Sequence, residues 1–186
     1  MIQTGKRLRR VAVYCGSACG TNPAFRKEAT ALGKAIAATG MGLVYGGTSI
    51  GLMGAVADAA LEGGAEVIGV LPEVLAGLEI AHRGLTALEL VRTMHERKAR
   101  MTELADAILV LPGGYGTLDE LMEAVTWAQL GLHSKPCILI NTATYWDGLL
   151  AFVDSSVTAG FVKPENRQLL LVASDADDAI QIVTSL

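Results

Sequence analysis

The sequence lacks the excess of positive charge that broad nucleic-acid binding requires. Its 186 residues include 15 Lys and Arg but 19 Asp and Glu, which gives a formal net charge of −4 and an isoelectric point near 5.4. Non-specific binding to a phosphate backbone depends on clustered Lys and Arg. The composition therefore argues against a nucleic-acid partner, and we expect Arg7, Arg9 and Arg10 to form a solvated leader.

Cysteines and long apolar runs are also scarce. Three cysteines do not indicate a disulfide framework, and Cys15 and Cys19 have a CxxxC spacing rather than that of a redox CxxC motif. The apolar run at 11–15 is too short for the core of a signal peptide. No later run approaches the roughly 18 residues of a membrane span. We therefore expect a soluble protein of the reducing cytoplasm, with no membrane partner.

Hydrophobic residues, in contrast, make up 51% of the chain. A chain of this length can bury a sizeable core and is close to the usual size of one domain. We expect a single domain over residues 1–186.

Short β-branched segments alternate with longer amphipathic segments from residue 9 onward, which predicts a series of βα units. Strands are expected at 11–15, 42–47, 66–72, 88–91, 107–114, 136–141 and 169–173. Helices are expected at about 23–38, 51–61, 94–104, from Thr117 onward, around 146–158 and from about 176, with a less regular stretch at 73–84.

Several of these predicted strands, such as AILVL and CILI, are apolar throughout. This is typical of a parallel sheet that helices cover on both faces, so we expect a doubly wound, Rossmann-like α/β fold. Such sheets bind ligands at the carboxyl ends of their strands, near a switch in strand order. Three predicted strands end there in small residues: Cys15-Gly16-Ser17, Tyr45-Gly46-Gly47 and Pro112-Gly113-Gly114.

The turn GGTSIGLMG at 46–54 matches neither of two familiar nucleotide motifs. Gly46 and Gly51 have the spacing of a P-loop, but Leu52 and Met53 stand where Lys and Ser or Thr would hold phosphate and magnesium. No GxGxxG is present there either. Two interpretations stay open: the glycines permit close helix packing, or the loop lines a ligand.

The segment PGGYGT at 112–117 follows an apolar strand and opens a helix. The unpaired N–H groups and the positive dipole end of a helix start favour an anion, so a phosphate would fit there. In the alternative interpretation, Thr117 and Glu120 form the T-x-x-E pattern of a capping box and only satisfy helix-end donors.

The segment MHERKARM at 94–101 places two cations on one helical face with two methionines, by the i, i+3, i+4, i+7 rule. That face consists of Met94, Arg97, Lys98 and Met101. Because unpaired buried charge is expensive, the cations either extend past the methionines to water or meet an anion in a cleft. On the opposite side, we expect Glu96 and Arg100 to form a solvated i, i+4 pair.

No residue pattern indicates a metal site. The three histidines, His82, His95 and His133, do not have metal-ligand spacing, and the cysteines do not complement them. We therefore predict neither a metal nor another cofactor. Ser17 could donate a hydrogen bond to a phosphate or a base, or be an ordinary turn serine.

Taken together, MHERKARM and PGGYGTLDE (112–120) resemble the paired signature of the Lonely Guy family of cytokinin-activating phosphoribohydrolases. YCGSACG near the start and YGGTSIGLMG resemble the first two loops of that family, so the similarity covers nearly the whole chain. Thr48 stands where the second loop of the family usually has the last glycine of GGG.

The resemblance implies a Rossmann-like homodimer that hydrolyses the N-glycosidic bond of (N6-modified) adenosine 5′-monophosphates and releases the free base and ribose 5-phosphate. It implies Arg97 and Glu120 as the catalytic pair. The other residues that it assigns to the nucleotide site are Met94, Lys98, Gly113, Gly114, Tyr115, Gly116, Thr117 and Asp119, with Gly16, Ser17, Gly46 and Gly47 in the first two loops. Glu73, after Leu71-Pro72, is matched to an acidic residue that contacts the base.

The required chemistry agrees with this assignment. Cleavage of a ribosyl bond develops positive charge on the sugar, which a carboxylate such as Glu120 can stabilise while it orients water. The phosphate does not react, so its binding energy can position the sugar. Arg97 could orient Glu120 or hydrogen-bond the ligand through its planar guanidinium.

Two other functions compete with hydrolysis. Family members have often been labelled lysine decarboxylases, but that reaction needs pyridoxal phosphate on a lysine, and none of the six lysines stands in a context typical of such a site. The second alternative is a non-catalytic nucleotide or molybdenum-cofactor carrier. The presence of both Arg97 and Glu120 disfavours a carrier.

Overall fold

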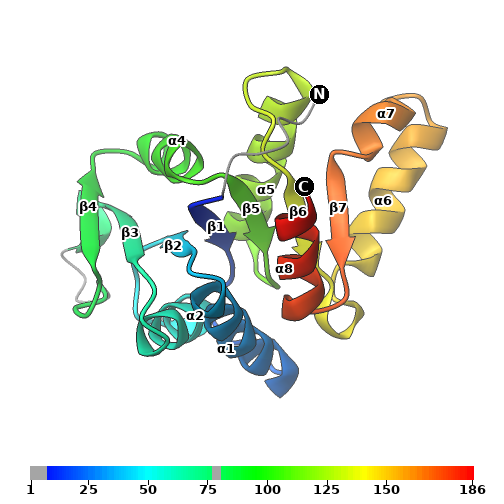
Figure 1. The fold of residues 1–186 in the computed structure, drawn as a ribbon. Coiled ribbons are helices and arrows are strands. Elements are labelled where there is room, and N and C mark those ends of the chain that lie inside the picture. Colours follow the sequence, from blue (N-terminus) through cyan, green and yellow to red (C-terminus); the bar gives the residue numbers. More distant parts are fainter. Residues whose placement is uncertain (1–7, 77–80) are drawn as a thin grey trace.

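A seven-stranded parallel sheet forms the centre of the computed structural model, which describes residues 8–76 and 81–186 (Figure 1). The strand order is β4-β3-β2-β1-β5-β6-β7, and every neighbouring pair is parallel. The strands are β1 (Arg10–Tyr14), β2 (Gly42–Tyr45), β3 (Val67–Pro72), β4 (Ala87–Val91), β5 (Ala107–Val110), β6 (Cys137–Ile140) and β7 (Leu170–Ala173). The predicted Rossmann-like α/β fold is confirmed.

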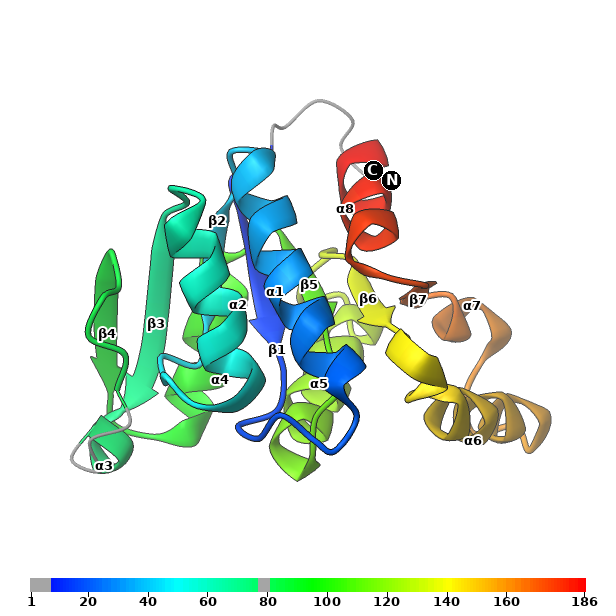
Figure 2. The same ribbon diagram turned by 90° about the horizontal axis from the view of Figure 1, so that it is seen from below.

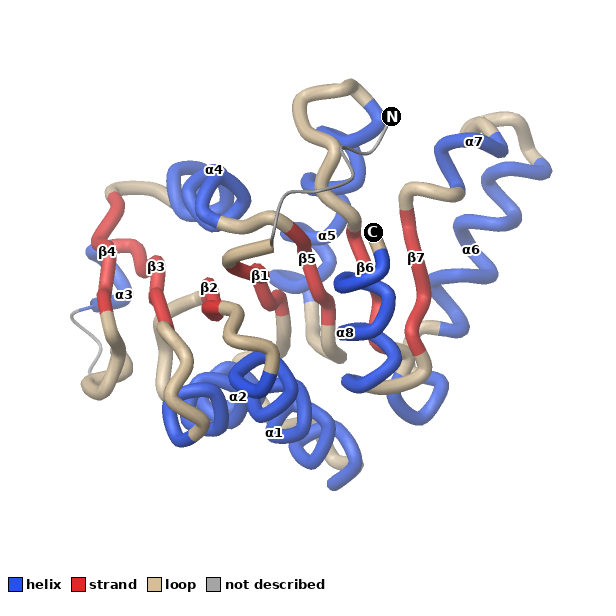
Figure 3. Tube along the Cα trace, in the orientation of Figure 1, coloured by secondary structure: helices blue, strands red, loops and turns tan. Residues whose placement is uncertain are grey.

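Helices cover both faces of this sheet (Figures 2 and 3). They are α1 (Pro23–Ala38), α2 (Gly51–Glu62), α3 (Glu73–Ala76), α4 (Met94–Leu104), α5 (Tyr115–Gln129), α6 (Asp147–Thr158), α7 (Pro164–Arg167) and α8 (Ala176–Ser185), with a 3-10 turn η1 (Thr142–Thr144). One face packs against α1, α2 and α8, and the other packs against α4, α5 and α6.

The alternation of side chains along a strand explains the two cores. In β1, Val11 and Val13 belong to the core beneath α1 and α2, whereas Ala12 and Tyr14 belong to the core beneath α4 and α5. Because both faces are covered, β5 and β6 are apolar at every position and β1 is apolar after Arg10, as the sequence predicted.

The strand order reverses at β1, which pairs with β2 on one side and with β5 on the other. The turns that follow these strands are therefore neighbours. The backbone N–H of Gly16 donates to the carbonyl oxygen of Pro112 (3.0 Å), and the N–H of Leu52 donates to the carbonyl oxygen of Gly16 (3.0 Å). Three turns rich in small residues thus meet at the carboxyl edge of the sheet, where ligands bind such folds.

The structure differs from the sequence-based expectations in two local segments, the N-terminal arginines and the stretch at 73–84. Arg10 is not part of a solvated leader, because it begins β1 and its Nε lies 2.7 Å from Oε2 of Glu66; Arg7 lies outside the described residues. In the stretch predicted to be irregular, the structure forms α3 and a bridge between Thr48 and Ala81, and residues 77–80 lie outside the described part. Of the helices in the described ranges, none has the length and apolar character needed to cross a membrane.

Candidate active site

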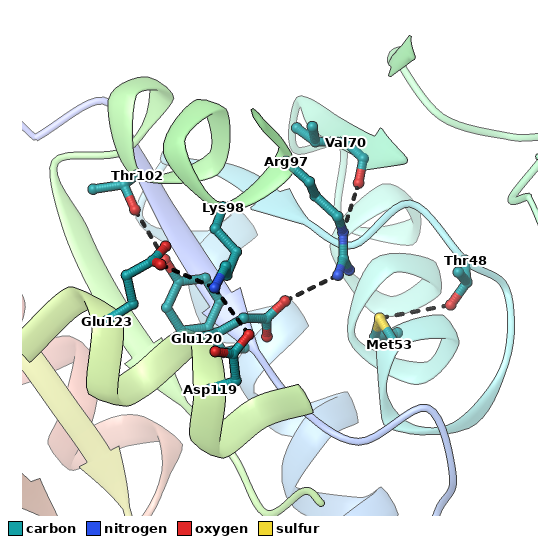
Figure 4. A network of polar contacts seen from close by, with 10 residues as sticks. Thr48, Met53, Val70, Arg97, Lys98, Thr102, Asp119, Glu120 and Glu123 are labelled. Carbon is teal, nitrogen blue, oxygen red and sulfur yellow. Dashed lines mark hydrogen bonds and ion pairs between the residues drawn. The ribbon is translucent and has the colours of Figure 1, made fainter. Parts of the chain in front are cut away.

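A buried ion pair between α4 and α5 lies at the centre of the site. The Nη1 of Arg97 donates to Oε1 of Glu120 at 3.1 Å, and each side chain is only 8% exposed (Figure 4). The Nε of Arg97 donates to the carbonyl oxygen of Val70 at 3.1 Å, near the end of β3. The guanidinium is therefore held by two elements that are distant in sequence, which fixes the orientation of its remaining N–H groups.

Burial changes the acidity of Glu120. Removal from water disfavours the charged carboxylate and raises the pKa of Glu120 to about 7. The positive charge of Arg97 opposes this rise, whereas the nearby Asp119 adds to it. A carboxyl group with such a pKa exists in both protonation states near neutral pH, as a group that exchanges protons with substrate or water requires.

Lys98 has different partners from those expected. Its side chain is 6% exposed, so it does not extend past the methionines to water. Its Nζ lies 2.9 Å from Oδ2 of Asp119 and 2.9 Å from Oε2 of Glu123, both on α5 (Figure 4). Burial alone would lower the pKa of Lys98, but the hydrogen bonds that it donates to Glu123 and Asp119 outweigh burial and raise the pKa. Lys98 is thus a cation that ties α4 to α5.

The start of α5 rules out the capping-box interpretation. The helix begins at Tyr115 rather than at Thr117, and its N-cap is Gly114, which has no side chain to cap with. Thr117 is buried inside the first turn, where its side chain lies against Gly113, and Glu120 contacts Arg97 instead of the helix end. The first N–H groups of a helix have no intrahelical partner, so α5 presents a positive end at this turn.

The glycine turns pack closely around these groups. A Cβ on Gly46 would overlap Nη2 of Arg97, and a Cβ on Gly113 would lie 2.9 Å from the nitrogen of Gly16. Gly47 has a φ of +79°, which favours glycine. Gly46 therefore permits close packing against Arg97, whereas the interpretation that GGTSIGLMG lines a ligand stays a prediction.

A cavity of about 280 Å³ lies between the turns after β1 and β5. It is lined by Gly16, Ser17, Ala18, Cys19, Gly20, Phe25, Leu52, Pro112, Gly113, Gly114 and Tyr145. The cavity adjoins the free end of α5 and offers mostly backbone and small side chains, which suits the close approach of a compact anion.

The structure places the remaining predicted residues around this centre with unequal exposure. Tyr115 is 93% exposed and Met94 is 43% exposed, whereas Met101 on the same helical face is buried. Gly116 is exposed at the start of α5, and Glu73 is exposed at the start of α3, directly after β3. Of the predicted set, Arg97, Lys98, Asp119 and Glu120 are brought into one network.

The expected pair of Glu96 with Arg100 is wrong. Glu96 bonds Arg92, with Nη2 of Arg92 at 2.9 Å from Oε1. Arg100 reaches Glu89 on β4 at 2.6 Å and Glu103 at 2.8 Å. Arg100 thus pairs with Glu103 at i+3 on its own helix and with a carboxylate on the neighbouring strand, and helical spacing does not encode the second partner.

Two residues of the site were missed by the sequence analysis. Glu123 follows Asp119 by one helical turn, so the i, i+4 rule could have placed it on the same face. Tyr145 lies beyond β6, and no pattern in its surroundings indicated a role. Within the described ranges, no group of three or more His, Cys, Asp or Glu side chains could hold a metal ion.

Comparison with known proteins adds independent information. A family described as "Possible lysine decarboxylase" matches residues 53–183. A probable cytokinin riboside 5′-monophosphate phosphoribohydrolase of Oryza sativa subsp. japonica is 49% identical over 94% of this chain and 77% of its own length. A cytokinin riboside 5′-monophosphate phosphoribohydrolase of Rhodococcoides fascians is 44% identical over 95% of this chain and 90% of its own length.

Solved structures are similar at lower identity. The molybdenum cofactor carrier protein of Chlamydomonas reinhardtii superposes with a TM-score of 0.74 at 24% identity, over 96% of this chain and 98% of its own. The molybdenum cofactor binding protein of Rippkaea orientalis superposes with a TM-score of 0.73 at 22% identity, over 97% of this chain and 98% of its own. These likenesses show the fold alone.

Proposed function

Because the chain belongs to the family of cytokinin riboside 5′-monophosphate phosphoribohydrolases, we propose that it hydrolyses the N-glycosidic bond of these nucleotides. The products are the free cytokinin base and ribose 5-phosphate. The observation that carries the proposal is the buried pair of Arg97 and Glu120 at the carboxyl edge of the sheet. The family description as a possible lysine decarboxylase has no comparable support, because Lys98 is held between two carboxylates.

In the proposed reaction, Glu120 faces the ribosyl carbon that loses its base. Its carboxylate stabilises the positive charge that develops on the sugar and orients the attacking water. Arg97 keeps the carboxylate in one orientation, because its guanidinium is itself fixed by the carbonyl oxygen of Val70. A pKa near 7 lets Glu120 accept a proton from that water at physiological pH.

The 5′-phosphate occupies the turn that opens α5. Its charge is stabilised by the positive end of the helix and by the free N–H groups of Tyr115, Gly116 and Thr117. Gly16 and Ser17 supply the adjoining wall. Since the phosphate provides binding energy without reacting, the corresponding nucleosides are poor substrates.

The substrate range includes AMP as well as N6-modified nucleotides, with Glu73 near the base. The reaction needs no metal, so a chelator leaves activity unchanged. The active form is a homodimer with α4 and α5 at or beside the interface, consistent with the exposed Met94 and Met122. A reducing compartment, the cytoplasm, suits the three free cysteines.

The decisive experiment is chromatography of the products from a panel of nucleoside 5′-monophosphates and their nucleosides. We expect base release from cytokinin riboside monophosphates and AMP, with little from nucleosides, in the presence of EDTA. Equal turnover of nucleosides would contradict the phosphate site. Tight nucleotide binding without base release would favour a carrier, and light scattering at micromolar concentration tests the dimer.

A further inference from the structure

Tyr145 reaches the glycine turn of the site from a different part of the chain. Its hydroxyl donates to the carbonyl oxygen of Gly113 at 2.6 Å, although the two residues are 32 positions apart. Tyr145 also lines the 280 Å³ cavity together with Gly113 and Gly114. The contact therefore links the loop after β6 to the turn that opens α5.

The loop that presents Tyr145 has an unusual backbone. Ala143 and Thr144 have φ values of 52° and 58°, in the left-handed region that residues with a Cβ disfavour. Such conformations persist only where the surroundings determine them, and they concentrate at functional sites. This loop thus adopts a strained path directly before Tyr145.

Several contacts hold the loop in that path. The side-chain oxygen of Asn141 accepts from the N–H of Trp146 (2.7 Å), and its amide donates to Asp147 (2.7 Å). Trp146 is buried at 2% exposure and anchors the loop in the core. The Tyr145 ring makes edge contacts with Phe25 (5.4 Å) and Trp146 (4.8 Å). The position of the hydroxyl is therefore set independently of any ligand.

Gly113 and Gly114 need an external support of this kind. Neither has a side chain, and glycine samples a wide range of backbone angles. Because the peptide unit between them is planar, a hydrogen bond that holds the Gly113 carbonyl also sets the direction of the Gly114 N–H. Gly114 is the N-cap of α5, so the orientation of this unit determines how the chain enters the first turn.

We propose that Tyr145 is a positioning residue for the phosphate of the substrate. It acts through Gly113, holding the glycine turn in the geometry that aims the free N–H groups of α5 at the anion. This inference rests on the proposed function for the identity of the ligand. It predicts that the hydroxyl affects binding of phosphate-containing ligands and leaves the chemical step at Glu120 unaffected.

The test is Tyr145→Phe, which removes the hydroxyl and keeps the ring between Phe25 and Trp146. We expect KM for AMP to rise about 5- to 10-fold with kcat within twofold of wild type, the change typical of one lost hydrogen bond. The Kd of ribose 5-phosphate, measured by calorimetry, should weaken by the same factor. The Kd of adenosine, which lacks the phosphate, should stay unchanged.

Tyr45→Phe is the matched control. The Tyr45 hydroxyl is buried at the end of β2 and has no hydrogen-bond partner among the residues that the structure describes. The same chemical change there should leave KM, kcat and both Kd values as in wild type. Melting temperatures of both variants should lie close to that of wild type.

Three other outcomes would decide against the inference. Unchanged KM and unchanged ribose 5-phosphate affinity in Tyr145→Phe would overturn it, as would a fall in kcat with intact binding. A parallel loss of adenosine binding with a lower melting temperature would assign Tyr145 a purely structural role. If wild type binds ribose 5-phosphate but releases no base, the proposed function fails, whereas the Kd comparison still decides the role of Tyr145.

Discussion

Gly46 leaves open the space that the guanidinium of Arg97 occupies. A Cβ at this position would overlap Nη2 of Arg97 and would lie 2.7 Å from Sδ of Met53. The absence of a side chain at the end of β2 is therefore a condition for the ion pair between Arg97 and Glu120. One methyl group at Gly46 tests whether the position of that guanidinium matters.

We predict that Gly46→Ala lowers turnover by at least about 100-fold, because a misplaced catalytic group costs this much or more. Binding of ribose 5-phosphate should change little. Gly148→Ala is the control: Gly148 lies in α6, where a Cβ would meet no atom of the described chain within 4 Å. That change should leave turnover intact. Activity of Gly46→Ala within threefold of wild type would argue against a fixed guanidinium.

Glu120→Gln separates charge from shape, since the amide has nearly the same volume as the carboxyl. We expect turnover to fall by about 10²–10⁴, with AMP affinity close to wild type, because the charge acts in the transition state. Glu165→Gln, on the exposed face of α7, should retain full activity. Turnover by Glu120→Gln within about tenfold of wild type would remove Glu120 from the chemistry.

The pH profile reports the ionisation of Glu120. If the carboxylate is the active form, kcat/KM should rise with pH and level off above about 7, the pKa that burial gives this group. The charge of Asp119 raises that pKa, so Asp119→Asn should move the acid limb to lower pH. A limb that remains in place, or moves to higher pH, would show that the limb belongs to another group.

Arg97→Gln should destabilise the fold in a pH-dependent manner. The folded pKa of Glu120 is raised, so the carboxyl keeps its proton in the fold at pH 5, where it needs no partner. At pH 8 the unfolded chain has lost this proton, and the variant fold must either keep it or bury an unpaired charge. We expect the loss in free energy of unfolding to be about 1 kcal/mol greater at pH 8 than at pH 5. Equal losses in urea titrations at the two pH values would contradict this.

The local elements of the fold were determined by short-range patterns in the sequence. Apolar strands alternating with amphipathic helices specify a parallel sheet covered on both faces, because each pattern repeats within a few residues. The turns at Gly16, Gly46 and Gly113 could also be predicted from the sequence, because small residues directly follow apolar strand segments there. Helical spacing correctly placed Arg97 and Lys98 side by side on α4.

The partners of these charges were decided only by the tertiary structure. Spacing paired Glu96 with Arg100, but Arg100 bonds Glu89 across to β4. The pattern T-x-x-E left a capping box open as one of two interpretations, but α5 starts earlier, at Tyr115, and Glu120 pairs with Arg97. A charged side chain takes the partner that compensates its burial best, and such partners lie on elements far apart in the chain.

Tyr145 shows most clearly that local sequence patterns do not reveal contacts between distant parts of the chain. Its neighbours Ala143 and Thr144 would by themselves favour an ordinary backbone, yet both adopt left-handed angles close to the buried Trp146, and the Tyr145 hydroxyl reaches Gly113. Local preference is worth about 1–2 kcal/mol per residue here, less than the burial of a tryptophan contributes. The sequence by itself determined the sheet, its helices and the edge where the turns meet, whereas packing across that sheet decided which side chains face each other there.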